Sequence, residues 1–262
     1  MRVTDAGRTL KSYAVPGRPI RDAHDVPVLA STKRLAHTNL DAWADAIDLR
    51  AHAADLDPDT RTILAKAWSE IAAAEHASIA AFAQLALDLL ALGAPSDLVD
   101  ATHEAARDEI RHARTGYAIA LAFADATLGP GPLVVPARPA IDLVTLATET
   151  FRDGCIGETI AALEMHEASK RAVPELEPVL ARIAEDESRH AELAWRIVAW
   201  AVCEGGTDVR DAIGAITFAY GEQARPARGG MFGIVDGATL AAVWAHALAV
   251  VVVPCRDELL HG

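Results

Sequence analysis

Four long stretches of the chain have a helical apolar pattern, and an acidic residue interrupts each pattern near its midpoint. The stretches run over about 58–92, 96–127, 140–171 and 178–204. Residues three, four and seven positions apart share one face of an α-helix. On the apolar faces stand Glu75, Glu109, Glu158 and Glu187. The pattern therefore predicts four helices whose core faces bring four carboxylates together.

Turn and cap residues separate these stretches. Asp57 and Pro58 form an N-cap and first-turn pair, and the loop LGPGPLVVPARP at 128–139 cannot be helical. We therefore expect an all-α fold in which two helical hairpins are joined by one long connection. The expected divisions are an N-terminal arm over 1–57, a four-helix bundle over 58–204 and a C-terminal helical extension over 205–262.

The composition indicates which kinds of binding partner and which cellular compartment to expect. The net charge of −13 disfavours nucleic acid and anionic membranes as partners. Three cysteines without framework spacing fit a reducing cytosol, so we expect a cytoplasmic protein. The apolar run at 238–253 contains His246 and is short for a membrane span. We expect it to form a buried helix that packs on the bundle, with no membrane partner.

Two pentapeptides, DEIRH at 108–112 and DESRH at 186–190, add histidines to the acidic faces. In each, the histidine follows the glutamate by three residues, so His112 joins Glu109 and His190 joins Glu187 on one helix face. Four buried, unpaired carboxylates are too costly to keep ionised without cations. Two divalent ions would neutralise them. The expected metal ligands are Glu75, Glu109, His112, Glu158, Glu187 and His190.

The order Glu, Glu-x-x-His, Glu, Glu-x-x-His resembles the ferritin-like di-iron carboxylate proteins over about 58–204. The repeated D-E-x-R-H resembles their oxygen-activating branch, which includes bacterial multicomponent monooxygenases, desaturases and ribonucleotide reductase small subunits. The resemblance implies a ferritin-like four-helix bundle with one long crossover. It also implies that Asp186 holds the free ring N–H of His112 and that Asp108 holds that of His190. Arg111 and Arg189 would pair with these aspartates; the alternative is that these charges only face solvent.

Small residues accompany the expected ligands on the core faces. They either leave volume for dioxygen and an organic substrate or simply let the helices pack closely, and the sequence favours neither. Cys155 is a pocket wall or a redox participant. The residues expected to line a pocket are Ala72, Phe82, Gly116, Phe151, Cys155, Ala162 and Met165.

These patterns predict a non-haem di-iron oxidoreductase of the monooxygenase or oxidase type. It would use O2 to hydroxylate, N-oxygenate or desaturate a small organic or peptide-derived substrate. The expected cofactor is a pair of iron ions, although the ligand set also suits manganese with iron. An electron donor is the expected partner, and a homodimer is the candidate assembly. The alternatives are a ferroxidase or peroxide-scavenging ferritin-like protein and, less favoured because of the negative charge, a transfer-RNA hydroxylase.

Overall fold

A computed structural model describes residues 18, 20–22, 24, 26–34, 43–124, 126–218 and 230–261. Much of the expected N-terminal arm and most of the Gly-rich loop at 221–233 lie outside these residues. The described chain is mostly helical, which confirms the all-α class.

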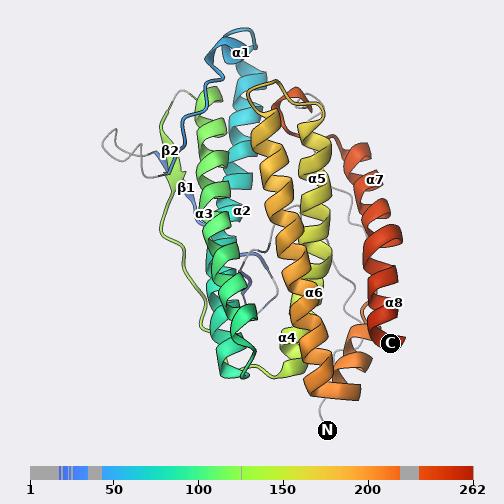
Figure 1. The fold of residues 1–262 in the computed structure, drawn as a ribbon. Helices are drawn as coiled ribbons and strands as arrows, with labels where there is room; N and C mark the ends of the chain where they lie inside the picture. Colours follow the sequence, from blue (N-terminus) through green and yellow to red (C-terminus); the bar gives the residue numbers. More distant parts are fainter. Residues whose placement is uncertain are drawn as a thin grey trace.

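Four long helical units lie side by side in the centre of the molecule (Figure 1). The first two, α2 (Pro58–Ala91) and α3 (Ser96–Phe123), pack against each other as a hairpin. The third is continuous through α4 (Leu143–Glu149), η2 (Thr150–Glu158) and α5 (Thr159–Ser169). It packs against the fourth, α6 (Glu177–Gly214).

The ends of the first unit follow from its sequence. The Asp57 side chain accepts a hydrogen bond from the Thr60 backbone N–H at 2.9 Å, and Pro58 occupies the first turn, where no N–H is needed. At the other end Gly93 adopts a φ of 75°, a conformation that glycine reaches without a Cβ clash. The hairpin turn expected here is therefore confirmed.

The third unit differs from a plain α-helix. Asp142 caps it by accepting from the Thr145 N–H at 2.8 Å. Residues Thr150–Glu158 then form a π-helix, which carries one expected ligand, Glu158, at its end. Such segments shift the register of the following side chains and occur often at functional sites. Nothing in the apolar pattern predicted this segment.

The fourth unit breaks where the sequence indicated. Gly206 has a φ of 57° and a ψ of −131°, so the regular helix ends there and a short second helix follows to Gly214. Gly205 and Gly206 were the expected stop signals.

The N-terminal region contributes less helix than expected. The stretch TNLDAWADAIDLRAHA at 38–53 predicts one short helix. Residues 38–42 lie outside the described residues, and in the part of the N-terminal region that the structure describes only α1 (Arg50–Ala54) is helical. Upstream, β1 (Thr32–Arg34) pairs antiparallel with β2 (Leu128–Pro130) of the long connection. This strand pair holds the arm beside the connection, as Figure 1 shows.

The C-terminal helix differs from the short buried helix that we predicted at 238–253. It runs continuously through α7 (Gly237–Ala247), η4 (Leu248–Val252) and α8 (Val253–His261) along the outside of the bundle (Figure 1). Its most apolar 18-residue window has a mean hydropathy of 2.0, and only 22% of that window is buried. The helix is therefore longer and more exposed than the buried helix that we predicted. Its length and composition are sufficient to cross a membrane, properties that core helices of soluble proteins share.

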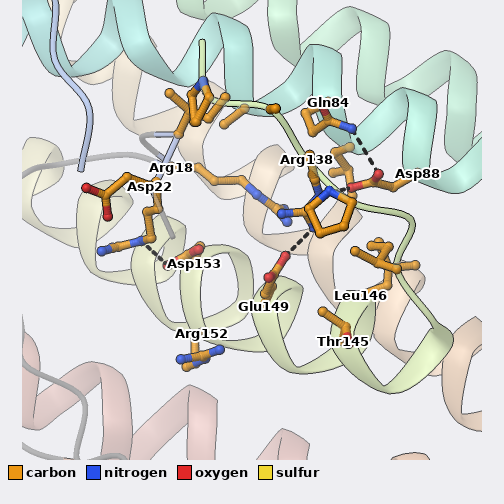
Figure 2. Close-up of a pocket in the computed structure, with 18 residues that line it drawn as sticks. Arg18, Asp22, Gln84, Asp88, Arg138, Thr145, Leu146, Glu149, Arg152 and Asp153 are labelled. Atoms are coloured by element: carbon orange, nitrogen blue, oxygen red, sulfur yellow. Dashed lines mark hydrogen bonds and ion pairs between the residues drawn. The ribbon is translucent and has the colours of Figure 1, made fainter. Parts of the chain in front are cut away.

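The long connection after β2 also ties the two hairpins together. Arg138 forms ion pairs with Asp88 of α2 at 2.9 Å and with Glu149 of α4 (Figure 2). The connection therefore lies across the gap between the first and third helical units, where it covers one side of the bundle.

Candidate metal centre

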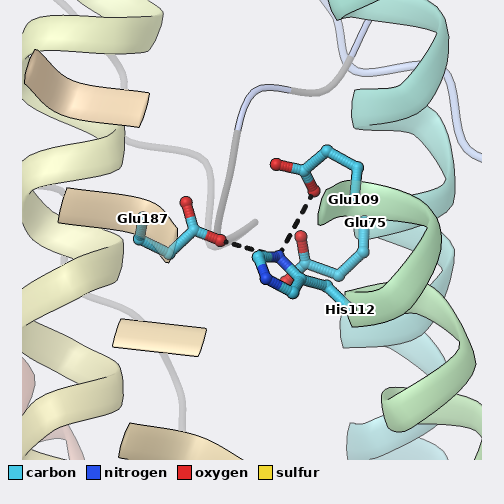
Figure 3. A group of neighbouring side chains, drawn as sticks. All are labelled: Glu75, Glu109, His112 and Glu187. Atoms are coloured by element: carbon cyan, nitrogen blue, oxygen red, sulfur yellow. Dashed lines mark ion pairs between the residues drawn. The ribbon is translucent and has the colours of Figure 1, made fainter. Parts of the chain in front are cut away.

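Six acidic and imidazole side chains meet inside the bundle, one or two from each long helical unit. All are at most 4% exposed. Figure 3 shows four of them pointing toward one another from different helices. They are the residues singled out from the helical patterns: Glu75, Glu109, His112, Glu158, Glu187 and His190.

These side chains form two overlapping groups. In each group the candidate ligand atoms all lie within 4.8 Å of one another. One group contains Glu75, Glu109, His112 and Glu187, and the other contains Glu158, Glu187 and His190. Buried Glu and His groups at this spacing can hold a metal ion, and the overlap at Glu187 makes the two groups neighbours.

Two carboxylates lie between the two histidines. Glu109 places one oxygen 3.2 Å from His190 Nδ1 and the other 3.8 Å from His112 Nδ1. Glu187 places one oxygen 3.2 Å from His112 Nδ1 and the other 3.4 Å from His190 Nδ1. Each carboxylate therefore lies near both histidines and could supply an oxygen to an ion held beside either of them.

Hydrogen bonding leaves these six residues incompletely satisfied. In the described part of the chain, twelve buried side-chain nitrogen or oxygen atoms have no hydrogen-bond partner, and eight of them belong to the six residues. They include both oxygens of Glu109 and of Glu158, and Nδ1 of both histidines. A buried polar atom without a partner costs free energy. The residues thus fit a metal site, where the ions would take these lone pairs.

Burial and mutual repulsion perturb the carboxyl groups strongly. Burial raises the pKa of Glu75 and Glu158 well above the usual value, and the nearby Glu109 and Glu187 raise it further. Burial acts in the same direction on Glu109 and Glu187, but their contacts with the two histidines outweigh it and lower the pKa of both. Without metal, Glu75 and Glu158 therefore have a higher pKa than Glu109 and Glu187.

The pKa of each histidine is raised, although burial alone would lower it. Desolvation would lower the pKa of His112, but contacts with Asp186, Glu109 and Glu187 raise it well above the usual value. His190 behaves in the same way through Asp108, Glu109 and Glu187. Acidic neighbours thus favour the protonated form of both histidines in the metal-free centre.

The aspartate and arginine of each pentapeptide contact side chains of the other pentapeptide on the neighbouring helix. His112 Nε2 lies 3.1 Å from Asp186 Oδ2, and His190 Nε2 lies 3.3 Å from Asp108 Oδ2. These contacts leave Nδ1 of each ring facing the carboxylates. Contact with His112 and Arg189 outweighs burial and lowers the pKa of Asp186 to about 2.

The two arginines complete the same symmetric network. Arg111 donates to Asp108 on its own helix and lies 3.4 Å from Asp186 on the other. Arg189 donates to Asp186 and lies 3.4 Å from Asp108. The side chains of both arginines are about half exposed, at 44% and 56%. They therefore close the network on the solvent side and are not charges that face only solvent.

The seven residues expected to line a pocket are all buried near the centre, but they do not line the pocket that the structure shows. They are Ala72, Phe82, Gly116, Phe151, Cys155, Ala162 and Met165. A Cβ added at Gly116 would lie 2.9 Å from Ala72 Cβ. These two small residues therefore serve close packing of α2 on α3. Burial raises the pKa of the Cys155 thiol well above its usual value, which keeps it protonated.

A pocket of about 430 Å³ lies instead between α2, α4 and η2, under the long connection (Figure 2). Its lining includes apolar side chains, namely Ile20, Ala81, Leu85, Ile141 and Leu146. It also includes arginines and carboxylates. Sequence reasoning missed this pocket because its lining comes from three segments far apart in the chain, 18–22, 81–88 and 136–153.

Arg18 lines the pocket and is linked to a candidate ligand through the Phe82 ring, and sequence reasoning missed it as well. Its guanidinium carbon lies 5.8 Å from the centre of the Phe82 ring. The same ring contacts the His190 ring edge-to-face at 5.2 Å between centroids. The only signal in the sequence was a basic residue in the arm, which by itself does not indicate burial. Phe82, expected as a pocket residue, separates the pocket from the centre.

Comparison of the chain with family models, with curated proteins and with solved structures found no match to any of the three.

Proposed function

We propose that the protein is a ferritin-like non-haem di-iron oxidoreductase that uses O2 to oxidise a small organic or peptide-derived substrate. One observation carries the proposal: six buried side chains from four helices leave eight polar atoms without partners in one place. The arrangement of one Glu from each of two helices and Glu-x-x-His from each of the others is that of the di-iron carboxylate bundles.

The residues divide naturally between two ions. Glu75 with His112 would hold one, and Glu158 with His190 would hold the other. Glu109 and Glu187, which face both histidines, would bridge them. Two divalent ions offset four carboxylates, so the filled centre needs no protons. Nitrogen and carboxylate ligands suit iron, and manganese with iron as a variant.

When bound, iron supplies the activation of O2 and the oxidation of a C–H or N–H bond. The protein's part is to hold the ligands in place and to keep water out. Asp186 and Asp108 each accept the Nε2 proton of a histidine, which fixes the tautomer that presents Nδ1 to the metal. Apolar side chains lie on both sides of the carboxylates along the bundle. Hydroxylation, N-oxygenation and desaturation by this centre each need electrons, so an electron donor belongs to the proposal.

The pocket beside the centre favours an organic substrate over the ferroxidase alternative. A ferroxidase needs no cavity for an organic molecule, whereas a volume of about 430 Å³ is within the range of small-molecule sites. Its lining combines apolar side chains with charged groups that could orient a polar organic molecule.

The proposal is tested by anaerobic titration of the full chain with Fe(II), followed by addition of oxygenated buffer. We expect two irons per chain and rapid O2 uptake that depends on them. Glu187→Ala should reduce both, because it removes the carboxylate shared by the two groups. Glu185→Ala is the matched control, since Glu185 is exposed on the same helix. Binding of one iron or none by the wild-type protein would contradict the proposal.

A further inference from the structure

Arg18 is a buried cation fixed between two helical units. It is 7% exposed and lines the pocket. Its backbone N–H donates to Ser78 Oγ on α2 at 3.1 Å, and its Nη2 donates to Thr150 Oγ1 on η2 at 3.1 Å. The backbone of Arg18 is therefore anchored to α2, and its guanidinium is anchored to η2.

The charge of Arg18 is not compensated in the way that its neighbours are. Arg21 pairs with Asp153 at 3.3 Å, and Arg138 pairs with Asp88 and Glu149. Within the described residues Arg18 has no carboxylate partner, and its contacts are a hydroxyl and the face of the Phe82 ring. A buried charge without a counter-charge is costly. An anionic group in the pocket would remove that cost.

We propose that this pocket binds a small substrate that carries one carboxylate, and that Arg18 is the residue that pairs with it. A guanidinium recognises a carboxylate through two parallel N–H donors, which fixes both position and orientation. Apolar side chains of the lining, among them Ile20, Leu85 and Leu146, contact the body of the molecule. The oxidation of the bound molecule rests on the proposed function, whereas its binding in the pocket does not.

The other charges of the pocket favour a carboxylate over a phosphate. Four acidic side chains line it: Asp22, Asp88, Glu149 and Asp153. These negatively charged side chains repel a dianion more strongly than a monoanion. One guanidinium suffices for one carboxylate. The structure therefore favours a monocarboxylate with an apolar body.

The position of Arg18 also sets where the ligand lies relative to the candidate metals. The Phe82 ring contacts both the Arg18 guanidinium and the His190 ring. A carboxylate held by Arg18 is thus one aromatic ring away from a candidate ligand. The anchor would then determine which part of the substrate can approach the centre, as a specificity residue does.

Binding can be measured without turnover, on the full-length protein loaded with diamagnetic Zn(II). The probe is 4-fluorobenzoate, followed by fluorine NMR, with the neutral 4-fluorobenzyl alcohol as its counterpart. We expect the carboxylate to bind more tightly than the alcohol. Arg18→Met should weaken the binding of the carboxylate about tenfold or more and leave that of the alcohol unchanged, while Arg18→Lys should weaken it less. Arg210→Met, at an exposed position on α6, is the control and should bind as the wild type does.

A second variant guards against misfolding of the first. Ala81→Phe narrows the pocket and leaves Arg18 in place, so it should also weaken the binding of 4-fluorobenzoate. Equal affinity of the wild type and Arg18→Met for the carboxylate would overturn the proposal, because the probe would then be bound elsewhere, such as at the metals. Failure of the wild type to bind the probe would overturn it too.

The same experiment separates this inference from the proposed function. Iron stoichiometry and O2 uptake test the metal centre, whereas the probe tests the pocket. Carboxylate binding through Arg18 in a protein that holds no iron would support the pocket and contradict the di-iron proposal. A protein that binds two irons but shows no Arg18-dependent binding of the probe would support the di-iron proposal and contradict the carboxylate site.

Discussion

His112 on α3 and Asp186 on α6 are joined by a contact of 3.1 Å between Nε2 and Oδ2. The contact fixes the ring so that Nδ1 faces the buried carboxylates. The same relationship holds between His190 and Asp108 at 3.3 Å. Each pentapeptide therefore positions the histidine of the other, and the two act as one unit across the bundle.

This cross-bracing predicts that Asp186→Asn weakens metal binding although Asp186 lies outside the candidate ligand groups. Loss of a partner that orients a metal-bound histidine typically costs about 10–100-fold in metal affinity. Competition for Zn(II) with a chromophoric chelator measures the change. Asp208→Asn, at an exposed position of α6, is the control. An unchanged affinity in Asp186→Asn would mean that the contact does not orient a ligand.

Metal binding should release protons and weaken as the pH falls. Burial raises the pKa of Glu75 and Glu158, and acidic neighbours raise the pKa of His112 and His190, so all four hold their protons more tightly in the metal-free protein than free side chains do. Ligands must lose these protons to bind. Calorimetric titration with Zn(II) in buffers of different ionisation enthalpy should show net proton release and an affinity that falls from about pH 8 to about pH 6. A binding enthalpy independent of the buffer would contradict this expectation.

Glu75→Gln should stabilise the metal-free protein at neutral pH and reduce its capacity for metal. The pKa of Glu75 is raised in the fold, so the unfolded chain gives up this proton more readily. Stability of the wild type therefore falls as the pH rises above the usual pKa of glutamate, about 4.3, and the variant avoids that loss. Chemical denaturation at about pH 7 and about pH 4 measures the difference, which should shrink at the lower pH.

Glu70→Gln serves as the control for this prediction, since Glu70 is exposed on the same helix. A metal-free Glu75→Gln protein that is less stable than the wild type at neutral pH would show that the carboxyl contributes more through contacts than its desolvation costs.

Gly116→Ala tests the close packing of α2 on α3. The new Cβ would lie 2.9 Å from Ala72 Cβ and 3.1 Å from Ala72 Cα, and the backbone cannot yield as a flexible side chain can. Overpacking of this kind costs about 1–3 kcal/mol, against a gain of about 1 kcal/mol for Ala over Gly in a helix. The free energy of unfolding should therefore fall relative to Gly214→Ala, whose new Cβ would have its nearest neighbour at 3.6 Å. Equal stability of the two variants would show that the helices can separate at little cost.

The sequence predicted the candidate centre well because its residues obey helical periodicity. Glu109 and His112 share a face at a spacing of three, and the apolar residues around them show that the face is buried. Asp57 and Gly93 marked the limits of the first helix, since capping and positive φ depend on local chemistry. The relation between Asp186 and His112 came from the family resemblance and not from the periodicity.

Features that depend on tertiary structure were not accessible in this way. The π-helix over Thr150–Glu158 leaves no mark in the apolar pattern, because its residues are as mixed as those of an α-helix. Arg18 is polar and lies in an irregular segment, so only the surrounding fold shows that it is buried. The C-terminal helix was predicted as buried from its apolar residues, although few other elements pack against it.

The central claim is that two metal ions lie among the six buried side chains. A crystal structure of the iron-loaded protein with anomalous data at the iron edge tests it most directly. The account predicts two anomalous peaks, one beside Nδ1 of His112 and one beside Nδ1 of His190, with Glu109 and Glu187 between them. A single peak, or none within reach of these residues, would contradict it.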